Sequence, residues 1–248
     1  MSDSWIVGIN PVEGALNNDA ERVSELLVEQ GQRNARVQEL ATRAKALNIP
    51  VHHRSREELD KLAGEARHQG VAARYEAPPM GSENDIADLL EKAGQDALIL
   101  VLDGVTDPHN LGACLRSAAA ARATAVIVPK DRAVGLTPVV RRASAGGADR
   151  VPLIAATNLA RVLRTLKDAG VWLTGLAGDT DTSIYSIDMK GPVALVLGSE
   201  GEGMRRLTRE TCDFVAKIPM PGPMESLNVS VATGVVLFEA LRQRSEKR

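Results

Sequence analysis

The chain contains few aromatic residues, with two each of Trp, Tyr and Phe among its 248 residues. Proteins that bind single-stranded nucleic acid without sequence preference stack successive bases on aromatic side chains. A binding surface built mainly on base stacking is therefore not expected. If the protein binds a nucleic acid, recognition should depend on phosphate contacts and on the shape of the RNA.

Long apolar runs and metal-binding spacings are also missing. The longest apolar runs, at residues 97–102 and 193–197, are far shorter than the roughly 20 residues of a membrane span. No basic region followed by an apolar core marks a signal peptide. Cys114 and Cys212 stand outside any CxxC or Cys/His spacing, and the four histidines show no ligand spacing. We expect a cytoplasmic protein with no membrane contact and no metal, whose cysteines pack as small hydrophobic residues.

Several nucleotide-binding and hydrolase motifs are absent too. The chain has no GxGxxG turn of a dinucleotide-binding fold, no Walker loop and no GxSxG elbow. Gly198, Gly201 and Gly203 follow a buried-strand pattern with a different spacing. Because glycine has no Cβ and tolerates positive φ, this turn suits close approach of the backbone to a flat ligand, although a plain strand-to-helix turn has the same composition.

Charge is unevenly distributed along the chain. The formal net charge is −2, but residues 116–167 contain ten basic and two acidic residues, a net charge of +8, and the remainder is at −10. A solvated helix surface usually mixes both signs. The concentration of one sign indicates a footprint for a polyanion.

Residues 1–75 read as a small α/β unit. Residues 5–9 suit a strand, and Asn10 with Pro11 predicts the start of a helix. Helical spacing returns at residues 35–47, and Ser55 with Glu58 forms a capping-box pattern. A short strand is expected at residues 68–73. Residues 76–96, rich in Pro, Gly and polar residues at their start, are expected to form a linker and a leading helix.

Residues 97–248 are expected to form a second α/β domain. Apolar runs alternate there with helical patterns, which predicts a parallel sheet buried on both faces between helices. The last helix is expected from residue 229 to about 242. The expected strands lie at residues 98–102, 125–128, 151–154, 171–176, 193–197 and 214–218.

Three segments resemble the signature motifs of the SpoU (TrmH) family of RNA ribose 2′-O-methyltransferases, in the SPOUT superfamily. They are DPHNLGACLR at residues 107–116, ALVLGSEGEG at 194–203 and IPMPGPMESLNVSVA at 218–232. Residues 8–16 and 68–70 also resemble the small substrate-binding domain that part of the family carries. The resemblance implies a carboxyl-terminal trefoil knot, which no sequence pattern would suggest because knots are nearly absent from proteins.

The resemblance also implies a cofactor and a site. S-adenosylmethionine would be held between apolar side chains and backbone groups, and polar residues would serve the RNA ribose. The implied cofactor residues are Leu197, Gly198, Ile218, Met220 and Leu227, and the implied catalytic residues are Asn110, Arg116, Glu200, Ser226 and Asn228. Arg116 is the family's usual candidate for activating the 2′-hydroxyl. Since arginine stays protonated in proteins, we favour Arg116 as a clamp for phosphate and ribose over a general base.

Simpler interpretations of these residues stay open. Asn110 could cap a helix that starts at Leu111, and Ser226 could cap the last helix, although Val229 leaves no capping box there. Arg116 and Glu200 could be solvated surface charges. Only the motifs favour the functional interpretation.

Within the family, the chain most resembles members that methylate a guanosine 2′-hydroxyl in large-subunit (23S) ribosomal RNA. The alternatives are a transfer-RNA 2′-O-methyltransferase of the same family and a noncatalytic RNA-binding or ribosome-assembly protein. The family further implies a homodimer, with Val231, Val235 and Phe238 of the last helix in a two-fold interface. Alternatively, this apolar face belongs to the core of one chain.

Overall fold

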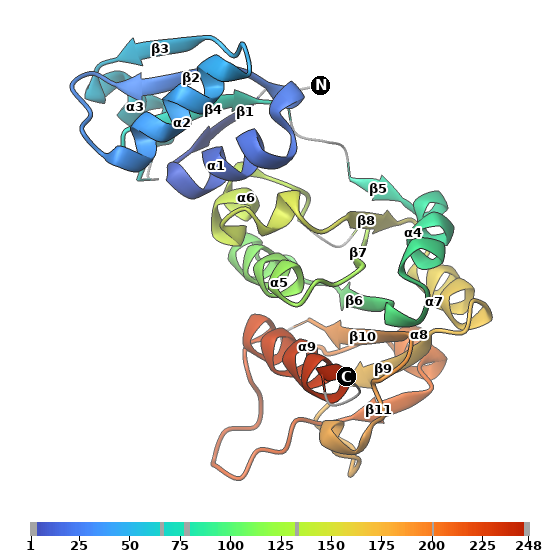
Figure 1. Cartoon of the computed structure of the whole chain (residues 1–248). Coiled ribbons are helices and arrows are strands. Elements are labelled where there is room, and N and C mark those ends of the chain that lie inside the picture. Colours follow the sequence, from blue (N-terminus) through green and yellow to red (C-terminus); the bar gives the residue numbers. More distant parts are fainter. Residues whose placement is uncertain (1–3, 65–66, 77–79, 132–133, 200, 246–248) are drawn as a thin grey trace.

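The computed structural model describes residues 4–64, 67–76, 80–131, 134–199 and 201–245. It contains a small sheet built from the amino-terminal residues and a larger sheet built from the rest (Figure 1). In the described part of the chain, no helix has the length and apolar character needed to span a membrane.

The small sheet is mixed and has the strand order β1-β4-β2-β3. Strands β1 and β2 run antiparallel to β4, and β2 runs parallel to β3. Its strands are β1 (Ser4–Val7), β2 (Val23–Glu29), β3 (Val51–Arg54) and β4 (Val71–Tyr75), and its helices are α1 (Ile9–Asn18), α2 (Ala35–Ala46) and α3 (Arg56–Ala63).

Local sequence signals predicted the helices of the amino-terminal unit better than the strands of that unit. Helix α2 and the Ser55 capping box of α3 are confirmed. The predicted start of α1 at Asn10 is wrong, because Gly8, with φ of 98°, precedes the first helical residue. Strand β4 begins only after His68 and Gly70, which form a turn in which the backbone N–H of Gly70 donates to Nδ1 of His68. Strands β2 and β3 were not predicted.

The larger sheet has seven parallel strands in the order β11-β9-β10-β6-β7-β8-β5. Its strands are β5 (Gly81–Ser82), β6 (Leu98–Asp103), β7 (Ala125–Pro129), β8 (Leu153–Ala156), β9 (Trp172–Leu176), β10 (Val193–Gly198) and β11 (Phe214–Ala216). Its helices are α4 (Ile86–Ala93), α5 (Pro108–Ala120), α6 (Pro138–Ser144), α7 (Leu159–Asp168), α8 (Arg206–Thr211) and α9 (Val229–Ser245).

Helices cover both faces of the larger sheet, which confirms the expected α/β class. One core cluster joins alternate residues of β6, such as Leu100, to α5 and α9, and another joins Ile99 and Val101 to α7. The expectation that every strand is buried on both faces is wrong for β11. It lies at the sheet edge, and its Phe214 is exposed. The trefoil knot stays a prediction, as does the division at residues 76–96, of which 77–79 lie outside the described residues.

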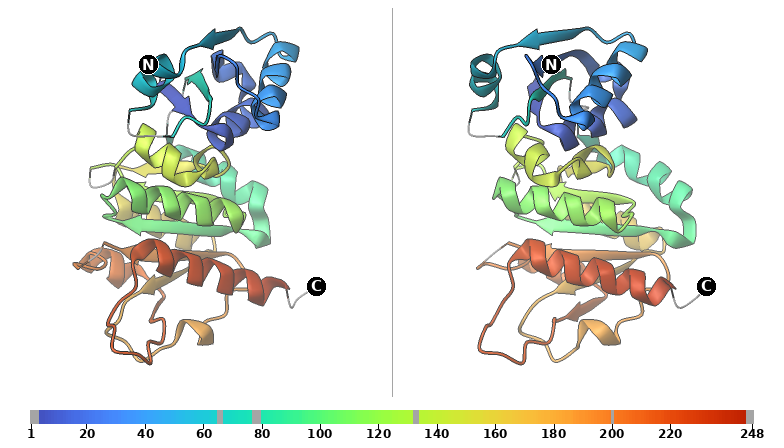
Figure 2. Two further views of the ribbon diagram at one scale, coloured as in Figure 1. Left: turned by 90° about the vertical axis from the view of Figure 1, so that its left-hand side faces the viewer. Right: turned by 60° about the vertical axis from the view of Figure 1, so that its left-hand side comes forward.

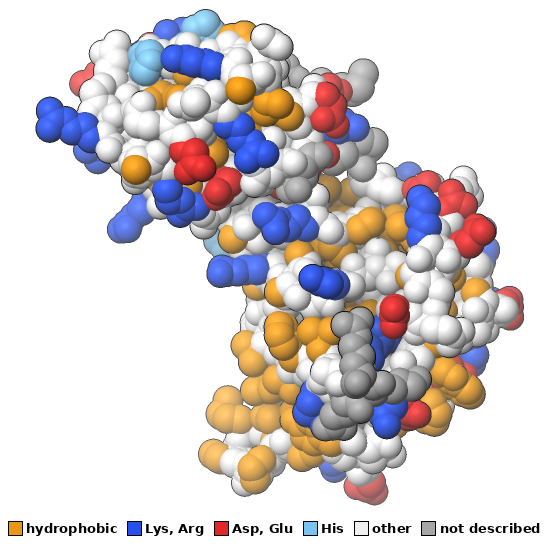
Figure 3. Space-filling view, viewed as in Figure 1, with side chains coloured by type: hydrophobic (Ala, Val, Ile, Leu, Met, Phe, Trp, Pro, Cys, Tyr) orange, Lys and Arg blue, Asp and Glu red, His pale blue; other side chains and the backbone are white. Residues whose placement is uncertain are grey.

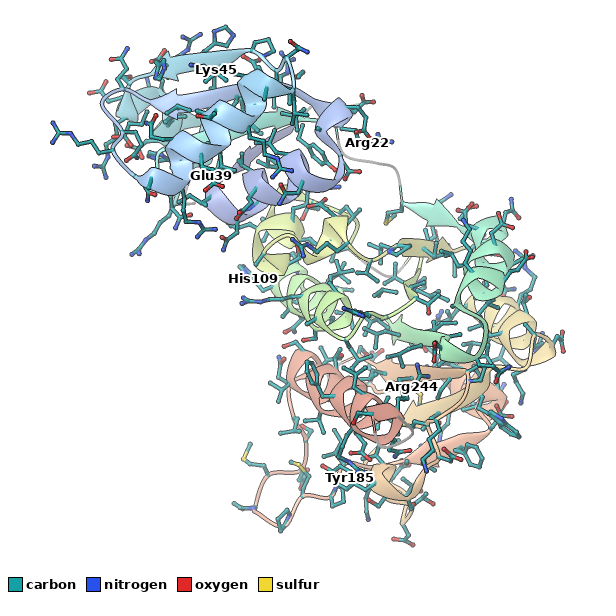
Figure 4. The ribbon with its side chains drawn as sticks, in the orientation of Figure 1. Arg22, Glu39, Lys45, His109, Tyr185 and Arg244 are labelled. Atoms are coloured by element: carbon teal, nitrogen blue, oxygen red, sulfur yellow. The ribbon has the colours of Figure 1, made fainter. Side chains whose placement is uncertain are left out.

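Helix α9 is held at both ends. At its start, the Asn228 side chain accepts a hydrogen bond from the backbone N–H of Ser230. Near its end, the Arg244 guanidinium donates to backbone carbonyl groups of two neighbouring segments (Figure 4). These acceptors belong to Asp96, Ala97, Met189 and Gly191.

A buried polar cluster joins the two sheets. Tyr75, at the end of β4, is fully buried, and its hydroxyl donates to Asp19 at 2.8 Å. The guanidinium carbon of Arg141, on α6, lies 5.1 Å from the centre of the Tyr75 ring, and Arg141 is paired with Asp149. Helix α6 therefore lies directly against the amino-terminal unit, as two further views show (Figure 2).

Candidate functional site

A cavity of about 730 Å³ opens at the carboxyl ends of three neighbouring strands of the larger sheet. In open parallel sheets, ligands bind outside this edge, because the loops that follow the strands meet there. The segments around residues 176–178, 197–203 and 217–232 line the cavity, and they follow β9, β10 and β11. Because β9 pairs with both β10 and β11, its loop lies between the other two.

Most of the residues implied by the motifs lie together in this cavity. All five of the implied cofactor residues line it, and so do two of the implied catalytic residues. These are Leu197, Gly198, Ile218, Met220 and Leu227, together with Ser226 and Asn228. The wall combines apolar side chains with a glycine-rich backbone segment, the usual composition of a site for a small molecule.

The glycine-rich turn requires Gly198 for a reason within the protein itself. Residues 199 and 203 form an antiparallel bridge with two backbone hydrogen bonds of 3.0 and 3.2 Å. A Cβ at Gly198 would lie 2.0 Å from the carbonyl carbon of Gly203 and 2.1 Å from the backbone nitrogen of Met204. A side chain at position 198 would therefore collide with the returning strand of the turn.

Asn110, on α5, is joined to the cavity through Asn228, which lines it. Helix α5 begins after Asp107, whose side chain accepts from the backbone N–H of Asn110, with Pro108 in the first turn. Asp107 is thus the N-cap, and the interpretation of Asn110 as the cap is wrong. The Asn110 side-chain oxygen accepts from the Asn228 amide at 3.0 Å. This contact joins the start of α5 to the rim of the cavity.

The cap of α9 also differs from the simpler interpretation. Asn228 precedes the helix, and its side chain accepts from the backbone N–H of Ser230, so Asn228 and not Ser226 caps α9. Asn228 therefore binds the start of α9 and Asn110 with the two ends of one amide group.

Arg116 lies apart from the cavity. It is exposed on α5, six residues beyond Asn110, which is about 9 Å along a helix axis. Its guanidinium forms no hydrogen bond or ion pair with any other described residue. The start of α5 is marked in Figure 4 by the exposed His109. Glu200, the remaining implied catalytic residue, lies outside the described residues.

Other residues of the cavity wall were missed by the sequence analysis. Lys217 and Glu225 place one basic and one acidic side chain on the wall, and Gly178 contributes the loop after β9. The loop after β9 carries no motif. Only the order of the strands, with β9 between β10 and β11, shows that this loop must reach the cavity.

A second hollow and the two cysteines do not form a comparable site. A hollow of about 930 Å³ lies at the opposite, amino-terminal edge of the sheet beside Trp172 and Phe214, but none of the three motifs reaches it. The cysteines are not nucleophiles at neutral pH. Burial raises the pKa of the Cys114 thiol to about 11, and burial with the neighbouring Asp213 raises that of Cys212 to about 12.

Two family models match the chain and together cover nearly all of it. The SpoU rRNA methylase family matches residues 97–238, and the RNA 2′-O ribose methyltransferase substrate-binding family matches residues 5–80. The 23S rRNA (guanosine-2′-O-)-methyltransferase RlmB of Xanthomonas campestris pv. campestris is 57% identical, over 98% of this chain and 97% of that protein.

Solved structures resemble the whole chain as well. The SpoU methyltransferase AviRb of Streptomyces viridochromogenes has a TM-score of 0.81 and 25% identity, over 99% of this chain and 91% of that one. The AdoMet-bound rRNA methyltransferase of Sinorhizobium meliloti has a TM-score of 0.77 and 25% identity, over 97% and 87%. With its second and third motifs gathered at one cavity and both family models matched, the chain belongs to the SpoU rRNA methylase family.

Proposed function

We propose that this protein transfers a methyl group from S-adenosylmethionine to the ribose 2′-hydroxyl of a guanosine in 23S ribosomal RNA. The observation that carries the proposal is the meeting of the second and third motifs in one cavity, with Asn110 of the first motif bonded to its rim. The 57% identity to the Xanthomonas enzyme over almost the full length supports 23S ribosomal RNA as the substrate and guanosine as the modified nucleotide. Because this RNA is made and assembled in the bacterial cytoplasm, we assign the protein to that compartment.

The cavity fits the cofactor in size and in chemistry. A volume of about 730 Å³ lies within the range of small-molecule sites, which is about 300–1,000 Å³. Leu197, Ile218 and Leu227 offer apolar surfaces for an adenine ring. Glu225 and Lys217 offer opposite charges for the ammonium and carboxylate groups of an amino acid. When bound there, S-adenosylmethionine supplies a methyl group on a positively charged sulfur atom.

The residues of this chain then have to bring a ribose oxygen into line with that methyl group. Positioning of this kind supplies much of the rate in a two-substrate transfer. We assign Arg116 to the RNA side, as a planar clamp that holds phosphate or ribose oxygens and stabilises negative charge on the attacking oxygen. Ser226 and Asn228 carry hydrogen-bonding groups at the cavity rim, where the ribose would enter, and Asn110 is bonded to Asn228 behind them. Glu200 is proposed as a further member of this set.

The amino-terminal unit is proposed to hold the RNA. Residues 1–75 would form the substrate-binding domain, 76–96 the linker with α4, and 97–248 the methyltransferase domain. Part of the basic segment at residues 116–167 lies next to this unit, because α6, within it, packs against β1. Exposed cations there, such as Arg142 and Arg150, would contact phosphates without reading bases.

We also propose a homodimer through α9. Val231 and Phe238 are each 52% exposed, whereas Val235 is half-buried. The preceding segment adds the exposed Met224 and Leu227. Hydrophobic side chains gather over this part of the surface in Figure 3. A contiguous exposed apolar patch of this kind is typical of an interaction site.

Sedimentation equilibrium at micromolar concentration tests the dimer. The wild-type chain should sediment with twice the mass of one chain, and Phe238→Asp should sediment as a monomer. Trp172→Asp is the matched control, because Trp172 is exposed to a similar degree at the opposite edge of the sheet. A wild-type mass of one chain would refute the dimer.

Methyl transfer is tested with labelled cofactor and three RNAs: 23S ribosomal RNA from cells that lack the enzyme, the same RNA from normal cells, and total transfer RNA. We expect label only in the first, at the 2′-oxygen of one guanosine. Label in transfer RNA would favour the alternative substrate of the family. Absence of transfer to any RNA, together with no cofactor binding in a calorimetric titration, would favour a noncatalytic RNA-binding protein.

A further inference from the structure

Asp103 is a charged residue in an otherwise apolar strand. It ends β6, and its side chain is fully buried. Its carboxylate accepts two hydrogen bonds from one residue: the backbone N–H of Arg205 at 3.0 Å and the Nε–H of the same arginine at 2.6 Å. A buried carboxylate is costly unless it is paired and hydrogen-bonded, so this arrangement has to be satisfied by Arg205 in the folded protein.

The pairing of Asp103 with Arg205 brings the two ends of the glycine-rich turn together. Asp103 is the register partner of Gly198 in the pairing of β6 with β10, so the first residue of the turn lies beside it. Arg205, bound to its carboxylate, follows the last residues of the turn. Both ends of residues 198–205 are thus fixed at one point, and the 199–203 bridge holds the middle.

The turn held in this way forms a wall of the cavity. Gly198, Ser199, Gly201 and Gly203 all line it, whereas Asp103 and Arg205 do not. Residue 103 also begins the segment that leads to Asp107 and α5, on which Asn110 lies. The buried carboxylate of Asp103 therefore lies beside the turn that forms a wall of the cavity and just before the helix that carries the first motif.

We propose that Asp103 is a positioning residue for methyl transfer, acting through Arg205 to hold the turn at residues 198–205 in the shape that completes the cofactor cavity. The proposal rests on the proposed function, since it assigns the turn to cofactor binding. The carboxylate touches neither the cofactor nor the ribose.

The neighbouring Arg206 provides a matched control. Arg206 is also an arginine and directly follows Arg205 in the chain. Its side chain, however, is 83% exposed and pairs with Glu210 one helical turn away. Exposed pairs of that kind contribute little to stability. Replacing Arg205 removes a hydrogen bond to a buried charge, and replacing Arg206 does not.

The test compares Arg205→Ala, Arg205→Lys and Arg206→Ala by calorimetric titration with S-adenosylmethionine, by kinetics with 23S ribosomal RNA and by RNA binding. We expect Arg205→Ala to raise the dissociation constant and KM for the cofactor by about 10- to 100-fold. The lysine variant should recover part of this loss, and RNA affinity should stay within about twofold of wild type. Arg206→Ala should match wild type in all three measurements.

The outcomes separate the two proposals. Cofactor affinity of Arg205→Ala equal to that of Arg206→Ala would overturn the role of the pair. So would a parallel loss of RNA and cofactor affinity, which indicates a general disturbance of the fold. If Arg205→Ala does not fold, the same comparison is made with Arg205→Lys and Asp103→Asn, each of which keeps one of the two hydrogen bonds. A wild-type protein that binds no cofactor would instead refute the proposed function.

Discussion

Replacement of Gly198 by alanine should open the glycine-rich turn and weaken cofactor binding. The added Cβ would lie 2.0 Å from the carbonyl carbon of Gly203 and 2.3 Å from its oxygen, where ordinary contacts begin near 3.4 Å. Both neighbours are backbone atoms, so no flexible side chain can move aside. The two strands of the turn must separate by more than an ångström, and the hydrogen bonds between Ser199 and Gly203 are lost.

The magnitude follows from these losses. Two backbone hydrogen bonds contribute about 1 kcal/mol each, and overpacking of this kind typically costs about 1–3 kcal/mol. Because the turn can open instead of compressing, we expect a total near 2 kcal/mol, or about 4–8 °C in Tm for a chain of this size. The same displacement removes one wall of the cavity. A loss of about 2 kcal/mol in binding corresponds to about 30-fold weaker cofactor affinity.

Calorimetric titration with S-adenosylmethionine and thermal unfolding without it measure the two effects. Gly191→Ala is the control, because Gly191 lies at the opposite, amino-terminal edge of the sheet, has no positive φ and has no atom within 4 Å of an added Cβ. We expect the control to match wild type. Cofactor affinity of Gly198→Ala within about twofold of wild type would show that the turn is not a wall of the binding site.

Three other substitutions test separate parts of the structure. Arg116→Ala should lower kcat by about 10²- to 10³-fold and leave cofactor affinity within a few-fold, and the lysine variant should recover only part of the rate; near-normal turnover at saturating RNA would remove this arginine from the mechanism. Partial burial raises the pKa of Glu83, but hydrogen bonds from Arg161 and from two backbone N–H groups outweigh it and hold the pKa below its usual value. The stabilisation is therefore present above pH of about 4.3 and lost as the pH falls through the folded-state pKa, so Glu83→Gln should cost about 2 kcal/mol in urea unfolding at pH 7 and much less near pH 3; an equal cost at both pH values would refute the assignment. Arg141→Ala leaves Asp149 buried without its ion-pair partner and should cost about 3–5 kcal/mol in thermal unfolding, and a cost below 1 kcal/mol would show that the joint between the sheets is solvated.

The parallel sheet could be predicted from the sequence because its central strands are buried on both faces. Continuous apolar runs such as those of β6 and β10, with helical patterns between them, are typical of a parallel sheet covered by helices. The small sheet was harder. Strand β3 contains His52, His53 and Arg54 and has no residue that is fully buried, so its composition carries no strand signal, and only pairing with β2 makes it a strand.

The sequence predicted those residues of the site that lie within motifs. It did not predict contacts between residues that are distant in the sequence. Leu197, Ile218 and Leu227 lie in motif segments, and the cavity contains all three. The pairing of Asp103 with Arg205 joins residues about a hundred positions apart, and no local pattern relates them. Tyr75 likewise looks like the end of an ordinary strand. Its burial against Arg141 depends on how the two units pack, which periodicity cannot show.

The cavity is assembled from segments of the chain that follow three different strands. The survival of the folded protein in the cell should therefore depend on the concentration of its cofactor. No partly folded chain presents all three walls, so S-adenosylmethionine binds the native state alone. A ligand of this kind adds about 2.7 kcal/mol to the stability when its concentration is 100 times the dissociation constant. Cells rich in the methyl donor would therefore keep more of this enzyme intact, and starvation for methionine would expose it to proteolysis before its catalytic rate had changed.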